Sequence, residues 1–197
     1  MQGSRREPVE LHHPARVFWA IAVVVLALDQ ATKAAVRASM LPGELRSFLP
    51  GFIDLTYVRN IGAAFGLFPG RQPVFIAVSL VVLVVIAGYW RRARPNLAII
   101  IVALALITAG AVGNLIDRAV IGRVTDFLSF AFVDFPVFNV ADAAIVTGTA
   151  ILIVWLLFAP EPQRPGVEVK ASEAPESAPP PETASALDDD AVTEGRG

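Results

Sequence analysis

The chain has 197 residues, and 55% of them are hydrophobic. Its mean hydropathy of +0.60 is too high for an ordinary soluble domain, whose surface needs more polar side chains. The formal net charge of −2 identifies no partner, and we expect no nucleic-acid partner. The absence of cysteine excludes disulfides, thiolate nucleophiles and cysteine-bound zinc.

Four apolar segments have the length of membrane-spanning helices: 17–36, 73–90, 96–116 and about 139–158. Each is close to the roughly 20 residues that cross a bilayer core as a helix. The Val- and Ile-rich segments are too long for buried strands, and lipid requires an internally satisfied backbone. The first segment follows arginines, as in a signal peptide, but it lacks a small-x-small cleavage site. We therefore expect it to be an uncleaved anchor.

Basic residues near the segment ends predict the topology. The tight connection "RRARP", at 91–95, is packed with arginine, and the N-terminus is also basic. Four spans then place both termini in the cytoplasm and the longer connections, about 37–72 and 117–138, on the outer face. We expect a cytoplasmic N-terminal extension at 1–15, a four-helix membrane domain at 16–158 and a disordered, Pro/Ala/Glu-rich cytoplasmic tail at 159–197.

The outer connection before the second segment contains a strand-like stretch. "FIDLTYVRN", at 52–60, is rich in β-branched and aromatic residues, and the small residues of "IGAAFG" follow at 61–66. The predicted fold class is therefore an all-α polytopic membrane protein with four transmembrane helices. A small β-like surface element lies between helices 1 and 2, at about 44–68.

The polar residues of the spans gather at their predicted outer ends. They are Asp29, Gln30, Thr32 and Lys33 in the first span, Asn114, Asp117 and Arg118 in the third, Asp126 in the following loop, and Asn139 and Asp142 at the start of the fourth. Each group also has a purely structural interpretation. Asp29 and Lys33 can be a simple i,i+4 ion pair, and Asp117 with Arg118 an interfacial helix end. Asn139 can be an N-cap, with Asp142 favoured by the helix dipole. Asp54 and Asp134 are expected to be solvated.

Elimination restricts the chemistry that this cluster can perform. Both histidines, His12 and His13, precede the first span, so the spans hold no serine–histidine pair and no HExxH zinc site. A serine–lysine pair would need Lys33 with Ser129 or Ser39, and no local motif supports it. Two carboxylates in a pocket of low dielectric can share a proton and act as acid and base. Asp126 and Asp142 can form such a pair if the 127–138 connection folds back.

Five segments occur in the order found in a known family: "LDQATK" (28–33), "NIGAAFG" (60–66), "GNLIDR" (113–118), "VTDF" (124–127) and "FNVAD" (138–142). Over about 15–158 the chain resembles lipoprotein signal peptidase, or signal peptidase II. The resemblance implies an aspartyl endopeptidase of the bacterial inner membrane, with its active site at the periplasmic face. It would cut a prolipoprotein just before its diacylglyceryl-modified cysteine.

The resemblance also implies the roles of individual residues. The catalytic pair would be Asp126 and Asp142, and no metal or cofactor is expected. The supporting residues would be Asp29, Lys33, Asn60, Gly62, Asn114, Arg118 and Asn139. Thr125 departs from the family pattern, in which an apolar residue is usual before the aspartate, and the connection from Asp126 to Asp142 is short for the family.

Two other classes of function compete with this interpretation. A transporter or proton-linked channel predicts polar residues at several depths, whereas here they lie on one side. A non-catalytic scaffold leaves the two aspartates unexplained. The expected partners are lipid-modified prolipoproteins and membrane lipids. A monomer is expected because one chain supplies both aspartates.

Overall fold

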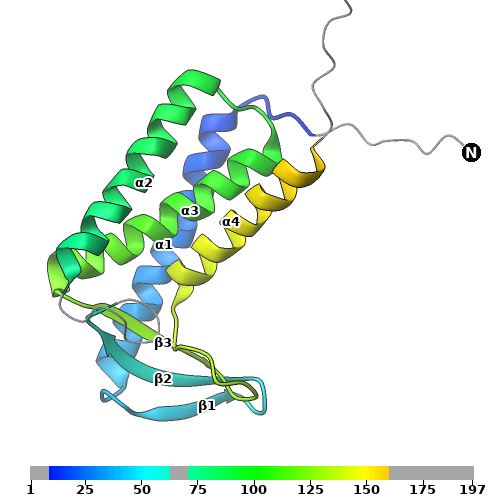
Figure 1. Cartoon of the computed structure of the whole chain (residues 1–197). Helices are drawn as coiled ribbons and strands as arrows, with labels where there is room; N and C mark the ends of the chain where they lie inside the picture. Colours follow the sequence, from blue (N-terminus) through cyan, green and yellow to red (C-terminus); the bar gives the residue numbers. More distant parts are fainter. Residues whose placement is uncertain (1–8, 63–70, 160–197) are drawn as a thin grey trace, which may run out of the picture. The chain divides into compact units, whose positions relative to one another are not determined.

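The computed structural model describes residues 9–62 and 71–159. Within them, four long helices are apolar enough to cross a membrane. They are α1 (Pro14–Ser39), α2 (Gln72–Ala93), α3 (Ala98–Ile116) and α4 (Val140–Phe158), and they lie alongside one another in Figure 1. The four predicted spans are confirmed. The tail after 159, the first eight residues and the segment 63–70, which holds the end of the predicted surface element, lie outside the described residues.

Helix α3 lies at the centre of the helical part. It packs against α1, α2 and α4, and many of its side chains are buried. In contrast, α2 buries none of its residues, and its many Val side chains are exposed, as expected for a helix that faces lipid. Beyond Ile116, α3 continues as one π-helical turn, η2 (Asp117–Ile121), so this helix is longer than its apolar segment.

Two glycines allow α3 and α4 to approach closely. A Cβ on Gly148 would lie 2.6 Å from the carbonyl oxygen of Ala103, and a Cβ on Gly110 would overlap the carbonyl oxygen of Ala141. Small residues at such contacts are the usual means of close helix packing in membranes. The α3–α4 contact fixes where α4 begins, and hence where Asp142 lies.

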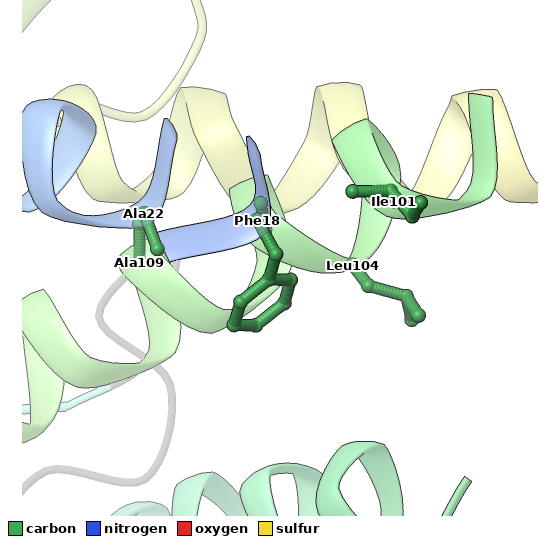
Figure 2. Close-up of a cluster of buried hydrophobic side chains, with 6 residues drawn as sticks. Phe18, Ala22, Ile101, Leu104 and Ala109 are labelled. Carbon is green, nitrogen blue, oxygen red and sulfur yellow. The ribbon is translucent and has the colours of Figure 1, made fainter. Parts of the chain in front are cut away.

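The apolar core joins α1 to α3 in the half of the molecule away from the sheet. Figure 2 shows Phe18 and Ala22 of α1 packed with Ile101, Leu104 and Ala109 of α3. The ring of Phe18 also lies 4.8 Å from that of Trp90 at the end of α2. This cluster contains no charged side chain, so it stabilises the helix arrangement and carries no chemistry.

A three-stranded antiparallel sheet lies at one end of the helices (Figure 1). Its order is β1 (Leu45–Leu49), β2 (Ile53–Asn60), β3 (Val124–Phe130). The first two strands lie in the connection where a β-like element was predicted. The third was missed: 124–130 was expected to be loop, yet it pairs with β2 and places Asp126 opposite Val58. The surface element is thus built from both outer connections.

The connection after β3 folds back as the carboxylate hypothesis requires. The backbone N–H groups of Phe127 and Leu128 both donate to the carbonyl oxygen of Phe138, at 3.0 and 2.8 Å, and the N–H of Phe138 donates back to Leu128. These bonds bring the start of α4 beside β3. The condition set for Asp126 and Asp142 to meet, that 127–138 folds back, is therefore fulfilled.

The opposite end of the molecule is closed by the N-terminal segment. The N–H of Leu11 donates to the carbonyl oxygen of Asn96 at 2.8 Å, and the N–H of Ala98 donates to that of Val9 at 2.9 Å. Residues 9–11 are therefore bound to the α2–α3 connection, although 1–15 was expected to be only an extension. The N-terminal segment and the arginine-rich connection lie at the same end.

Candidate active site

Asp126 is held on β3 with both carboxylate oxygens occupied. Its side chain accepts a hydrogen bond from Asn139 Nδ2 at 2.6 Å on Oδ1 and from Asn60 Nδ2 at 2.9 Å on Oδ2. Asp126 is only 2% exposed. Burying a carboxylate costs free energy unless its oxygens accept hydrogen bonds. Here the side-chain amides of Asn60 and Asn139 donate these bonds.

Asp142 lies in the first turn of α4 and completes the helix cap. The N–H of Asp142 donates to Asn139 Oδ1 at 2.9 Å, and Asp142 Oδ2 accepts from the N–H of Asn139 at 3.2 Å, which is a reciprocal capping box. Asp142 Oδ1 also accepts from Asn114 Nδ2 at 2.7 Å. The predicted N-cap is confirmed, and the same two residues also belong to the polar cluster.

Two asparagine amides connect the aspartates. Asn139 Nδ2 donates one hydrogen to Asp126 and the other to Asn114 Oδ1, at 3.2 Å. Asn114 in turn donates to Asp142. The strand that carries Asp126 and the helix that carries Asp142 are thereby held in one network, and both carboxylates line the same groove.

Burial and the second carboxylate change the acidity of Asp126. Desolvation is the largest cause, and the negative charge of Asp142 adds to it; together they raise the pKa of Asp126 to about 6. The hydrogen bonds from Asn60 and Asn139 and the charge of Lys33 act in the opposite direction. A carboxyl group in this range can hold or release a proton near neutral pH.

A fully buried lysine lies behind the aspartate pair. Lys33 Nζ lies 2.9 Å from Asp29 Oδ2 and 3.5 Å from Asp117 Oδ2, and it donates to Asn114 Oδ1 at 2.9 Å. Lys33, Asp29 and Asp117 are each 0% exposed. The pair Asp29–Lys33 exists as predicted, but it is not a simple surface ion pair, because it contacts the amide that holds Asp142.

Asp29 and Asp117 each also bind backbone of a neighbouring element. Asp29 Oδ1 accepts from the N–H of Ala141 at 2.9 Å, at the start of α4, and Gln30 Nε2 donates to Asp29 Oδ2 at 3.0 Å. Asp117 Oδ2 accepts from the N–H of Thr125 at 2.9 Å, next to Asp126. Asp117 is the C-cap residue of α3, as the helix-end interpretation expected, but it is fully buried and also supports the strand, so it is more than an interfacial helix end.

The remaining predicted residues are Gly62 and Arg118, and the acids Asp54 and Asp134 that were expected to be solvated. Gly62 donates its N–H to Asn60 Oδ1 at 2.8 Å and so orients the amide that binds Asp126. Arg118 lies on η2, donates to the carbonyl oxygen of Asn114 at 3.4 Å and has its guanidinium carbon 5.2 Å from the centre of the Phe75 ring. Asp134 is exposed, as predicted, and Asp54 is half-buried.

Arg37 was missed by the sequence reasoning. It lies in the last turn of α1, one turn beyond Lys33, and its Nη1 donates to Thr125 Oγ1 at 3.0 Å. The signal that could have found it is the i, i+4, i+8 spacing of Asp29, Lys33 and Arg37, which places all three on one helix face.

Two grooves meet at the aspartates. The larger, of 820 Å³, runs between α2, α3 and α4 and has a mostly aliphatic and aromatic lining that ends in Asn114, Arg118 and Asp142. The smaller, of 400 Å³, lies between β3, α4 and the connection with Phe130, Phe135 and Phe138. Arg118 and Asp142 line both grooves, and Asp126 lines the smaller one. An apolar chain in either groove would end beside a carboxylate.

The arrangement suits acid–base chemistry on a bond presented at the end of the helices. Over 9–62 and 71–159, no group of three His, Cys, Asp or Glu side chains could hold a metal ion. The polar contacts of Lys33 are two carboxylates and an amide, and Ser129 instead bonds to Thr56, so the serine–lysine alternative receives no support. Fold and site together define a polytopic membrane protein with a buried aspartate, Asp126, and a half-buried one, Asp142, at one end of its helices.

The comparisons with known proteins agree with that class. Residues 21–158 match the family described as Signal peptidase (SPase) II. A lipoprotein signal peptidase of Pelotomaculum thermopropionicum is 46% identical over 70% of this chain and 88% of its own length. One of Geobacter metallireducens is 44% identical over 70% and 88%. A solved bacterial membrane enzyme is 29% identical, with a TM-score of 0.73 over 81% of this chain and 98% of its own. The chain belongs to the signal peptidase II family, and it is a membrane protease.

Proposed function

We propose that this chain is an aspartic endopeptidase that removes the signal peptide from diacylglyceryl-modified prolipoproteins. It cuts on the N-terminal side of the lipidated cysteine. Family membership supports the removal of lipoprotein signal peptides. The observation that carries the aspartic mechanism is the pair Asp126 and Asp142, joined through Asn139 and Asn114 at the junction of two grooves.

The pair supplies both a base and an acid. One carboxylate takes a proton from water, whose oxygen attacks the carbonyl carbon of the scissile peptide bond. The other, protonated at the start, donates its proton to the departing amine as the C–N bond breaks. Each of the four carboxylate oxygens accepts one hydrogen bond from Asn60, Asn114 or Asn139 and keeps a lone pair for water or substrate.

The grooves suit a substrate that is itself embedded in the membrane. The signal peptide is an apolar helix, and the cysteine carries two acyl chains, so the substrate needs apolar surface on both sides of the reacting bond. The aliphatic lining between α2, α3 and α4 and the phenylalanines after β3 provide such surface, and Asp142 lies beside both. The sheet would hold the peptide from above.

The proposed location is the bacterial inner membrane, with both termini in the cytoplasm and the aspartate pair at the periplasmic face. The arginine-rich connection at 91–95 and residues 9–11 lie together at one end, which supports a cytoplasmic position for that end. Asp126 and the sheet belong to the two connections at the other ends of the helices.

The test is cleavage of a diacylglyceryl-modified prolipoprotein by the purified chain in detergent, followed by sequencing of the new N-terminus. We expect release of the signal peptide by the wild type and none by Asp126→Asn or Asp142→Asn. Asp134→Asn is the matched control, because Asp134 is an exposed acid of the same connection. Cleavage by either dyad variant, or a cut elsewhere than before the modified cysteine, would contradict the proposal.

A further inference from the structure

Arg37 reaches from α1 to the strand that carries Asp126. Its Nη1 donates to Thr125 Oγ1 at 3.0 Å and lies 3.8 Å from Asp117 Oδ1. The side chain is 27% exposed, so its aliphatic part and head are largely enclosed although it lies in the last turn of a helix. An arginine that only balanced the helix dipole would remain in solvent.

Thr125 is held from two directions. Its hydroxyl accepts from Arg37 of α1, and its N–H donates to Asp117 Oδ2 of η2 at 2.9 Å. The residue is 2% exposed and directly precedes Asp126. Successive side chains of a strand point to opposite faces, so Thr125 points away from the face that carries Asp126. It therefore fixes the backbone of β3 from behind.

Arg37 also balances the charge of the buried cluster. Two buried carboxylates, Asp29 and Asp117, lie beside the single buried ammonium group of Lys33. Arg37 supplies a second positive charge, next to Asp117. Asp117 Oδ1 is buried and has no hydrogen-bond partner among the described residues. The nearby guanidinium is the group that compensates it. Without Arg37 the cluster would hold one uncompensated negative charge behind Asp126.

We propose that Arg37 and Thr125 are positioning residues for the peptidase reaction, and that their hydrogen bond fixes β3 so that Asp126 meets Asp142. The inference rests on the proposed function of the aspartate pair.

The test compares kcat, KM and thermal unfolding for Thr125→Val, Thr125→Ser, Arg37→Leu and the double variant Arg37→Leu/Thr125→Val. We expect Thr125→Val to lower kcat about tenfold with KM within about twofold, because a small displacement of a catalytic group slows chemistry more than binding. Thr125→Ser should restore kcat, because it keeps the hydroxyl. The double variant should be no slower than Arg37→Leu, because both changes remove the same bond.

Arg16→Leu is the control, since Arg16 is an exposed arginine of the same helix, at the end away from the sheet. Wild-type kcat in Thr125→Val, no rescue by serine, or multiplied losses in the double variant would each overturn the inference. Asp126→Asn is measured alongside. If Asp126→Asn stops cleavage while Thr125→Val has no effect, only the positioning role is refuted. If the Asp126→Asn variant still cleaves the substrate, the proposed function is refuted too. Thr125→Val deletes no charge, so the test stands even if Arg37→Leu does not fold.

Discussion

Replacing Lys33 with methionine tests whether the buried charges hold the site together. Methionine keeps most of the volume of the side chain but removes the ammonium group. Its loss would leave Asp29, which lies 2.9 Å from Nζ, without a cation, and Asp117 with only Arg37 at 3.8 Å. Both carboxylates are fully buried. Removing one partner of such a pair costs about 3–5 kcal/mol, since the remaining charge cannot be solvated.

That cost corresponds to a fall of roughly 10 °C in the apparent unfolding temperature for a domain of this size. The assay is thermal unfolding in detergent, with Arg46→Gln as the control. Arg46 forms an exposed ion pair, and such pairs contribute about 0–1 kcal/mol. Adding Asp29→Asn to Lys33→Met should recover part of the loss, because it removes the carboxylate that is left without a cation. An unfolding temperature within about 2 °C of wild type for Lys33→Met would refute the reasoning.

Two further predictions concern the same region. The pKa of Asp126 is raised from 3.8 to about 6, so the folded form binds the proton more tightly than the unfolded form. The free energy of unfolding should therefore fall as pH rises from about 4 to about 6. Thermal unfolding scans should show a smaller fall for Asp126→Asn than for the wild type. An equal fall in both would contradict the assignment. Gly113→Ala should lower the unfolding temperature, because the new Cβ would lie 2.5 Å from Asp29 Oδ2, whereas Gly88→Ala, with nothing within 4 Å, should leave it unchanged or raised.

The helices could be predicted from the sequence because each depends on local properties. Length and hydropathy define a span, and the capping pattern of Asn139 and Asp142 defines where α4 begins. Strand β3 could not be found in this way. Its partner β2 lies far away in the chain, and a strand whose pairing is distant has only a weak local signal.

Elimination together with the family resemblance led to the hypothesis of the pair Asp126 and Asp142, and both side chains line one groove. The sequence could not show which groups the residues around the aspartates contact. Asp117 looked like a helix end, yet it binds the backbone of Thr125. Arg37 was not singled out from the sequence, and the fold shows that its side chain donates to Thr125 of β3.

Because of the capping box, replacing Asp142 with asparagine has a particular consequence for the structure. Asp142→Asn keeps a side-chain oxygen that can accept from the N–H of Asn139, so α4 can still begin at the same place. The other carboxylate oxygen becomes an amide nitrogen, so the negative charge and the hydrogen bond accepted from Asn114 are lost. On the proposed mechanism, Asp142→Asn would be inactive while its grooves stay intact, so this variant would be the natural bait for capturing uncleaved substrates from a bacterial membrane.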